Sequence, residues 1–151
     1  MGAFMVVSGA KKVERKLEKM GRTSGRKFIK KALVETNKEV VLPAVKRSAA
    51  ARVGGEMGRL IAKHTKRRAF KKAKKGNAVD VVDISAKGND DFVVVTKDGK
   101  RKYIPFAIEF GHGSVKPNPF FRLAWHEAHG RAQKLLGKKI VDGVLNAAKK
   151  A

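Results

Sequence analysis

The 151-residue chain has no cysteine, which excludes disulfide bonds and thiolate metal sites. It also lacks any apolar run near the roughly 20 residues that a membrane-spanning helix needs. Its first residues are apolar but carry no basic leader, unlike a secretory signal peptide. A hydrophobic content of 42% is typical of a folded chain, and we predict a single domain over residues 1–151.

Acidic residues are scarce, because 13 Asp and Glu stand against 36 Lys and Arg and leave a formal charge of +23. A surface this positive attracts polyanions over a long range and repels copies of itself. Nucleic acid, an acidic protein or an anionic membrane could be the counterpart. Stable self-assembly then requires widely spaced charge, strong apolar contacts or a bound polyanion.

The positive charge is densest in residues 63–75, where eight of thirteen residues are Lys or Arg. This segment is too charged for a core, so we predict a loop or a projecting arm. We interpret it as contacting DNA phosphates without sequence choice, or an acidic partner; the alternative is a solvated loop. Phe70 is its only aromatic residue, which argues against a stacking platform for single-stranded bases. The candidate contact residues are Lys63, Lys66, Arg67, Arg68, Lys71, Lys72, Lys74 and Lys75.

Apolar residues at helical spacing predict a long central helix from about residue 26 to Gly54. Pro43 lies inside this pattern and should kink or divide the helix near Val41, because proline removes a backbone donor and crowds the preceding turn. A short strand over residues 4–7 and a helix over residues 10–20 are predicted before it.

The last helix is predicted to begin at Pro119 and to run to about Ala148, with one apolar stripe. Asn118 is a suitable N-cap for it, and proline is favoured at the first helical position. Two glycines, Gly130 and Gly137, weaken this helix and allow a bend.

β-Branched residues predict strands over residues 79–84 and 92–96, and Asp98–Gly99 is a strong hairpin signal. Phe106, Ile108 and Phe110 alternate with smaller or polar residues, so a strand ending at Phe110 should complete a small antiparallel meander. Residues 56–61 could start a strand or finish a helix. The predicted fold is α+β, with a long kinked central helix and a C-terminal helix packed on a small antiparallel β-sheet.

Two histidines on the last helix raise the question of a metal site. His126 and His129 are three residues apart, whereas the zinc-binding helix motif requires a spacing of four. His112 could approach them, but we interpret all three as surface or interface residues. Residues 54–59 lack the spacing and the lysine of a phosphate-binding loop. We predict no metal and no cofactor.

Glu109 is the single carboxylate in an otherwise apolar segment. A buried carboxylate with a shifted pKa could be catalytic, but no second carboxylate, nucleophile or base stands at an informative spacing. We therefore predict an ion pair or a helix-end contact, with Arg122 as the candidate partner. A hydrolase using Glu109 and the histidines is the least favoured alternative, and we predict that the protein is not an enzyme.

Residues 104–111, Ile-Pro-Phe-Ala-Ile-Glu-Phe-Gly, and residues 118–124, Asn-Pro-Phe-Phe-Arg-Leu-Ala, resemble one family. They are similar to the pattern Ala-Pro-Phe-Val-Glu-Phe-Gly followed by Gln-or-Asn-Pro-Phe-Leu-Arg-Pro-Ala in the small neck or tail-component proteins of long-tailed bacteriophages, except that Leu123 replaces a proline. Gly-Arg-Leu at residues 58–60 matches a weaker motif after the central helix. The motif residues, which the resemblance implies are structural or at interfaces, are Gly58, Leu60, Phe106, Glu109, Phe110, Gly111, Pro119, Phe120 and Arg122.

The resemblance implies a structural virion protein at the head–tail junction, assembled in the host cytoplasm. It implies a homo-oligomeric ring, with six subunits favoured, that joins the connector or adaptor to the tail terminator and completes the DNA passage. Other neck proteins and genomic double-stranded DNA are the implied partners, and no membrane is. The alternative is a non-specific nucleic-acid-binding protein, for which the charge of +23 is the whole case.

Overall fold

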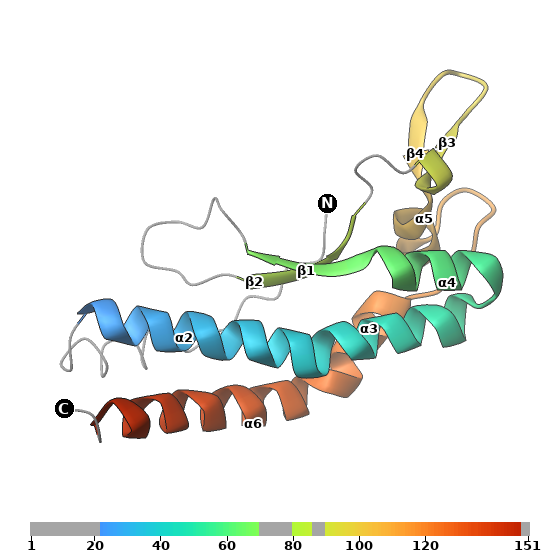
Figure 1. Ribbon diagram of the computed structural model, residues 1–151. Helices are drawn as coiled ribbons and strands as arrows, with labels where there is room; N and C mark the ends of the chain where they lie inside the picture. The colour runs from blue at the N-terminus through green and yellow to red at the C-terminus, as the bar shows by residue number, and fades with distance from the viewer. Residues whose placement is uncertain (1–21, 70–79, 86–89, 149–151) are drawn as a thin grey trace.

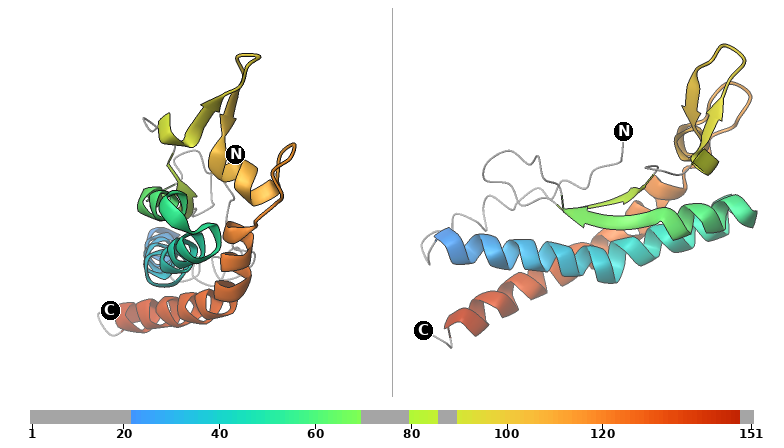
Figure 2. Two further views of the ribbon diagram at one scale, coloured as in Figure 1. Left: turned by 90° about the vertical axis from the view of Figure 1, so that its right-hand side faces the viewer. Right: turned by 45° about the horizontal axis from the view of Figure 1, so that its top comes forward.

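The computed structural model describes residues 22–69, 80–85 and 90–148, and it has the predicted α+β fold. A long central helix and the C-terminal helix α6 (Phe120–Ala148) lie side by side and run in opposite directions (Figure 1). A short β ribbon lies along the other side of the central helix. A second ribbon stands away from the helices at one end of the molecule (Figure 2). The strand and helix predicted over residues 4–7 and 10–20 lie outside the described residues.

The central helix contains α2 (Arg22–Thr36), the π-helical turn η1 (Asn37–Val41), α3 (Leu42–Ser48) and a second π-helical turn η2 (Ala49–Val53). The kink predicted near Pro43 is confirmed. Pro43 is the second residue of α3 and lies inside a continuous helix, and the wide turn η1 directly before it accommodates the ring and the missing N–H. The helix ends at Gly54, whose φ of 70° is accessible to glycine without strain.

Residues 55–64, for which the sequence left strand and helix open, form helix α4 (Gly55–His64). This helix folds back against η2 at close range. A Cβ atom at Gly58 would lie 2.7 Å from the carbonyl oxygen of Ala49, so only glycine fits without a shift of the backbone. The Gly-Arg-Leu segment thus begins with a glycine that close helix packing requires.

The segment over residues 63–75 is not a loop or arm in its first half, which corrects the prediction. Lys63 lies in the last turn of α4, and β1 (Thr65–Ala69) pairs antiparallel with β2 (Asp80–Ile84). Thr65 is buried and Arg67 is half-buried, whereas Lys66 and Arg68 are exposed, so the strand has an inner and an outer face. Acidic residues on β2 compensate the inward charge, which the local composition did not reveal. Residues 70–75 lie outside the described residues.

The hairpin predicted at Asp98–Gly99 is confirmed. A 3-10 turn η3 (Asp90–Phe92) leads into β3 (Val93–Val95), which pairs antiparallel with β4 (Arg101–Tyr103). The described strands form two separate two-stranded sheets, so the expected single meander is wrong.

The strand expected to end at Phe110 is also wrong, because residues 104–110 form the short helix α5 (Ile104–Phe110). Pro105 occupies its first turn, and Gly111, with a φ of 77°, ends it. Alternation would have put Ile108 and Phe110 on one face, but the helix buries Pro105 and Glu109 and leaves Phe110 exposed. Over these few residues, the spacing of the apolar side chains fits both the two-residue period of a strand and the 3.6-residue period of a helix.

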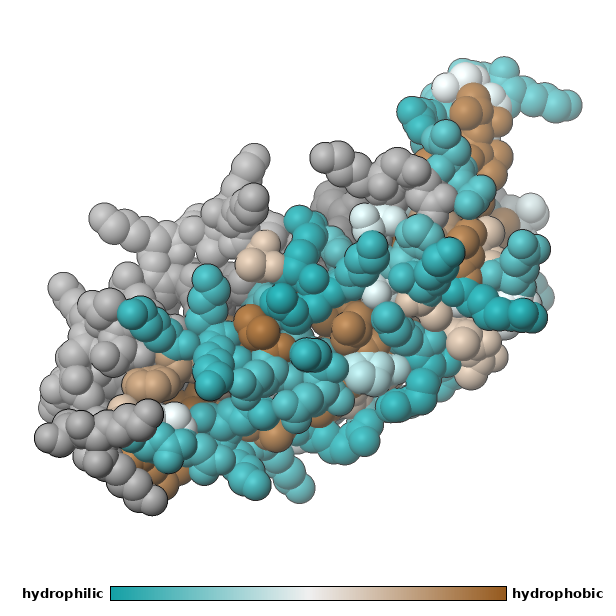
Figure 3. Space-filling view, viewed as in Figure 1, coloured by the Kyte–Doolittle hydropathy of each residue, from teal (hydrophilic) through white to brown (hydrophobic). Residues whose placement is uncertain are grey.

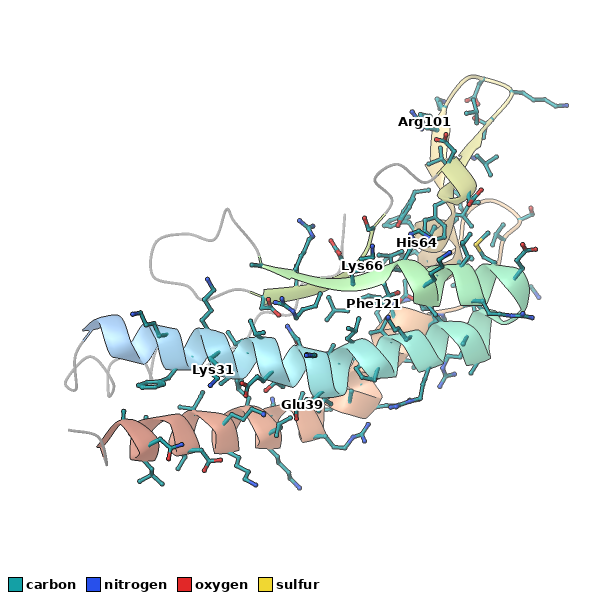
Figure 4. The ribbon with its side chains drawn as sticks, viewed as in Figure 1. Lys31, Glu39, His64, Lys66, Arg101 and Phe121 are labelled. Atoms are coloured by element: carbon teal, nitrogen blue, oxygen red, sulfur yellow. The ribbon has the colours of Figure 1, made fainter. Side chains whose placement is uncertain are left out.

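Three buried apolar clusters run along the helix pair. The middle one joins Val41, Val45 and Val82 to alanines of α6, whose small side chains allow the helices to approach closely. Beside it, the Lys139 Nζ atom donates to Glu39 at 2.8 Å and lies 2.9 Å from the Glu35 carboxylate. Figure 4 places Glu39 on the side of the central helix that faces α6. No described helix is long and apolar enough to cross a membrane.

Candidate assembly surface

Glu109 joins α5 to the N-terminus of α6. Its carboxylate oxygens accept hydrogen bonds from the backbone N–H of Phe121 at 2.8 Å and of Arg122 at 3.0 Å. The Arg122 Nε atom donates to the same carboxylate at 3.0 Å, and the Glu109 side chain is only 6% exposed. The first N–H groups of a helix have no partner within it and lie at its positive end, so a carboxylate stabilises them. Both predicted roles of Glu109, ion pair and helix-end contact, are confirmed.

Asn118 does not cap α6 with its side chain in the way the sequence suggested. Its Nδ2 atom donates to the carbonyl oxygen of Arg52 at 2.9 Å, and its backbone N–H donates to Ile108 at 2.7 Å. The loop from Gly111 to Asn118 is therefore attached to both the central helix and α5. The Glu109 carboxylate, nine residues upstream of Asn118, binds the helix N–H groups instead.

Phe106 and Phe110 form an exposed aromatic pair on the outer face of α5. Each residue is 47% exposed, and their ring centroids are 4.6 Å apart. The Arg122 guanidinium lies over the Phe110 ring at 4.9 Å from its centroid, within the range of a cation–π interaction. Arg122 therefore contacts the buried carboxylate of Glu109 and the exposed ring at the same time.

Other exposed apolar side chains lie at the same end of the molecule. Figure 3 shows hydrophobic residues along the β3–β4 ribbon, in contrast to the hydrophilic surface of the helices. We call these exposed residues and the aromatic pair together the apolar surface: Val94, Val95, Phe106, Phe110 and Val115. Val94 and Val95 are neighbours in β3 and therefore lie on opposite faces of the ribbon. The remaining large exposed hydrophobics of the described chain, Val141 and Leu145, lie near the opposite end, on α6.

The two sequence segments that carry the family resemblance converge on one apolar cluster. Phe120 is fully buried there with Ile61 and Phe92, and Leu60 packs against them. Gly58 lies buried in α4, Gly111 ends α5, and Pro119 is half-buried before α6. Most of the motif residues thus build the base on which the apolar surface stands, whereas Phe106, Phe110 and Arg122 reach solvent.

Tyr103 links the standing ribbon to the first one. Its hydroxyl donates to the Ile84 carbonyl oxygen at 3.1 Å, and its ring packs edge-on against Phe92. Burial, with a smaller contribution from the Asp83 carboxylate, raises the pKa of Tyr103 to about 12. The neutral phenol is therefore part of the packed structure.

The predicted basic contact residues are only partly available for a partner. Lys63 and Lys66 are exposed, but Arg67 forms an ion pair with the buried Asp80, and Arg68 with Asp83. These pairs hold β1 to β2 and use part of the charge that the sequence assigned to DNA. The predicted contacts Lys71, Lys72, Lys74 and Lys75 lie outside the described residues.

A buried polar contact that the sequence reading missed attaches the first ribbon to the central helix. The Asn37 Nδ2 atom donates to the Asp80 carboxylate at 2.8 Å and to its carbonyl oxygen at 3.1 Å. Both residues are almost completely buried. The partners are 43 positions apart, and Asn37 looks like an ordinary polar helix residue in the sequence, so no local signal identified the pair.

The histidines do not gather around a common centre. His126 and His129 are exposed on α6, where the His129 Nδ1 atom lies 2.7 Å from the His126 carbonyl oxygen. His112 forms a β-bridge with Val115 in the loop. Within residues 22–69, 80–85 and 90–148, no group of three or more His, Asp or Glu side chains is placed to hold a metal ion.

No family model, curated protein or solved structure matches this chain. The family resemblance therefore depends on the motif residues alone, and the geometry around Glu109 shows what these residues do in the fold. They hold α5 against the N-terminus of α6 and leave Phe106 and Phe110 exposed.

Proposed function

We propose that this protein is a structural component of the head–tail junction of a long-tailed bacteriophage. In this proposal copies of the chain form a ring, with six subunits favoured, that joins the connector or adaptor to the tail terminator around the DNA passage. The observation that carries the proposal is the Glu109 joint, because it makes the motif residues the support of an exposed apolar surface. A protein that works by binding needs such a surface on a rigid base.

The apolar surface supplies the binding energy in this mechanism. Burying apolar area yields about 25 cal/mol per Å², and a few aromatic and Arg anchors dominate most interfaces. Phe106, Phe110 and Arg122 combine these residue types in one place. The short helix that carries the two phenylalanines is fixed from behind by Glu109, so little ordering is required when a partner binds.

The basic residues act on DNA or on acidic neighbours. Lys63 and Lys66 are exposed at the end of α4 and on the outer face of β1, and the other lysines of the basic segment follow them in the sequence. Phosphate contacts of this kind add affinity without sequence choice. They suit a protein that encloses passing DNA of any sequence.

Imaging of virus particles tests the location. Cryo-electron microscopy of intact particles should show density for this fold as a closed ring between the capsid vertex and the tail tube. Particles made without the protein should accumulate as separate heads and tails. Absence of the fold from the junction, or normal joining without the protein, would overturn the proposal.

Charge reversal tests the basic segment separately from the fold. Reversing Lys66, Lys71 and Lys72 to Glu should impair the joining of heads to tails while the melting temperature stays close to that of the wild type. Reversal of Arg67 or Arg68 is a poor test by itself, because it also breaks the ion pairs with Asp80 and Asp83. Unchanged yields of infectious particles from the lysine variant would remove the basic segment from the mechanism.

A non-specific nucleic-acid-binding protein is the second candidate, favoured by the charge of +23 and by the exposed Lys63 and Lys66. Such a protein should bind duplex DNA alone, with affinity falling steeply as salt rises. Size-exclusion chromatography with and without DNA separates the candidates. A complex that forms with DNA and is independent of Phe106 and Phe110 would favour this second function.

A further inference from the structure

The aromatic pair on α5 is exposed although its helix is firmly held. Phe106 and Phe110 are each 47% exposed, whereas Pro105 and Glu109 on the opposite face are buried. Glu109 accepts hydrogen bonds from two backbone N–H groups of α6 and from Arg122, which fixes the helix in position. A rigid element therefore presents the rings to solvent. Their exposure is not the result of a loosely held segment.

The charged groups beside the aromatic pair are cationic. Arg122 is 52% exposed and lies over the Phe110 ring, and Lys116 is exposed in the following loop. Glu109 is the only carboxylate between residues 104 and 122, and its oxygens are already occupied by donors from α6. The Glu109–Arg122 pair is close to neutral as a whole, so Lys116 supplies the net positive charge of this segment, and Arg122 offers a partner its remaining N–H donors.

A second copy of the chain does not offer matching chemistry. Each copy carries a formal charge of +23, and the same cationic edge would face itself across a two-fold contact. The other exposed apolar pair, Val141 and Leu145, has Lys138 and Asp142 beside it, so that its neighbouring charges cancel. The one carboxylate beside that pair, Asp142, is thus offset by Lys138 and does not provide the acidic border that would match the aromatic pair.

Nucleic acid fits the cationic edge but not the rest of the surface. Phosphates would pair with Arg122 and Lys116, yet the aliphatic Val94, Val95 and Val115 have no π face for stacked bases. The two phenylalanine rings are tilted against each other by 42° and occupy one another's faces in part. Apolar side chains of a protein fill such a surface better.

We infer that the exposed aromatic face of α5, with Phe106 and Phe110, binds an acidic amphipathic segment of a second protein. Apolar side chains of that segment cover Phe106 and Phe110, which are one helical turn apart, and its flanking Asp or Glu carboxylates pair with Arg122 and Lys116. This inference deepens the proposed function and rests on it for the identity of the partner as another junction protein. The binding chemistry itself is independent of where the protein acts.

Binding of synthetic peptides to the purified full-length protein tests the inference. The probe is a fluorescein-labelled helical peptide with Leu on one face and Glu at the flanking positions, and matched peptides carry Gln or Lys in place of each Glu. Fluorescence anisotropy should show the Glu peptide binding at least tenfold more tightly than the Gln peptide. Its affinity should fall with rising salt, because the flanking pairs are screened.

Variants of the protein separate binding at the aromatic face of α5 from attraction to the positive charge of the whole protein. Phe106→Ser with Phe110→Ser should weaken Glu-peptide binding about tenfold or more, as expected for central aromatic anchors. Lys116→Glu should weaken it severalfold. The matched control, Val141→Ser with Leu145→Ser, removes an exposed apolar pair of similar exposure elsewhere and should leave binding within about twofold. Circular dichroism melts establish that all variants are folded, and Val115→Ser serves as a milder alternative at the same surface.

Several results would overturn the inference. Equal loss of binding in the control variant would show only general attraction to a basic protein. Equal binding of the Gln peptide would show that carboxylates contribute nothing to recognition. Self-association that strengthens with salt and disappears in the Phe106→Ser/Phe110→Ser variant would assign the surface to a second copy. Competition by single-stranded DNA that depends on the same phenylalanines would assign it to nucleic acid. The head–tail proposal fails separately, on the particle images.

Discussion

Glu109 in α5 starts helix α6 by accepting a hydrogen bond from the backbone N–H of Phe121, although the two residues belong to different helices. The same carboxylate binds the N–H and the guanidinium of Arg122. A helix N-terminus is usually capped by the residue that directly precedes it. Here the cap comes from a separate element, so one side chain fixes both the start of α6 and the placement of the aromatic pair.

Replacement of Glu109 tests this joint. Glu109→Ala leaves two helix N–H groups and Arg122 without their acceptor and should lower the free energy of unfolding by about 2 kcal/mol. Glu109→Gln keeps one acceptor and should lower it by about 1 kcal/mol. Chemical denaturation measures both. Glu127→Gln, which removes an exposed ion pair with Arg52, is the control and should stay within about 0.5 kcal/mol of the wild type. A loss no larger than the control's would contradict the role of Glu109.

Replacement by alanine should have opposite effects on stability at two glycines. Gly58 lies in the close contact of α4 with η2, and Gly130 lies on an open face of α6. Gly58→Ala places a Cβ 2.7 Å from the Ala49 carbonyl oxygen and should destabilise the protein by about 1–3 kcal/mol. Gly130→Ala in α6 adds a Cβ into open space and should stabilise the protein by up to about 1 kcal/mol through helix propensity. Thermal melts of the two variants measure the difference. If Gly58→Ala is as stable as Gly130→Ala, the packing of α4 is not as described.

Tyr103, the only tyrosine of the chain, gives a direct optical test of the packing between the two ribbons. The native protein should form tyrosinate with a midpoint of about pH 12, whereas an unfolded chain should do so near the ordinary value of 10.0. Because the pKa of Tyr103 is raised, the stability that its neutral form contributes is present below pH 10 and is lost as pH rises toward 12. Ultraviolet absorbance of tyrosinate follows the transition. Tyr103→Phe should remove this alkaline loss, and a native midpoint near 10 would contradict the buried hydrogen bond to Ile84.

The contact between the central helix and α6 should respond to acid through Glu35. A hydrogen bond from Lys139 lowers the pKa of Glu35 from 4.5, so the stabilisation is present above that value and is lost as pH falls through the native pKa. The Glu39 and Glu35 carboxylates raise the pKa of Lys139, so its contribution is present below 10.5 and is lost only as pH rises through the native value. Melting temperatures across the acid range should fall less steeply for Lys139→Met than for the wild type. Identical acid profiles would show that Glu35 and Lys139 do not interact in solution.

The two long helices, the central helix and α6, could be predicted from the sequence because their signals are long and local. The apolar stripe of α6 extends over many turns, and Pro43, Gly54 and Asp98–Gly99 mark a kink, a helix end and a turn by their own backbone chemistry. The role of Glu109 was also predictable, since one carboxylate among apolar residues requires a cationic or N–H partner, and Arg122 was within reach.

The errors arose where the structure depends on distant partners. Residues 104–110 are too short for their apolar spacing to separate strand from helix, and the capture of Glu109 by α6 favours the helix. The dense positive charge of β1 predicted a loop. The residues that compensate this charge, Asp80 and Asp83, come later in the chain, so the local sequence did not show them. The buried contact of Asn37 with Asp80 depends on the same pairing and left no local trace.

The Glu109 joint also determines where a load on the exposed rings goes. The first turn of α6 is attached to the element that carries these rings, and α6 is about 43 Å long. Because buried clusters pack α6 against the central helix, a pull on the rings is carried by both long helices and not by the seven residues of α5 alone.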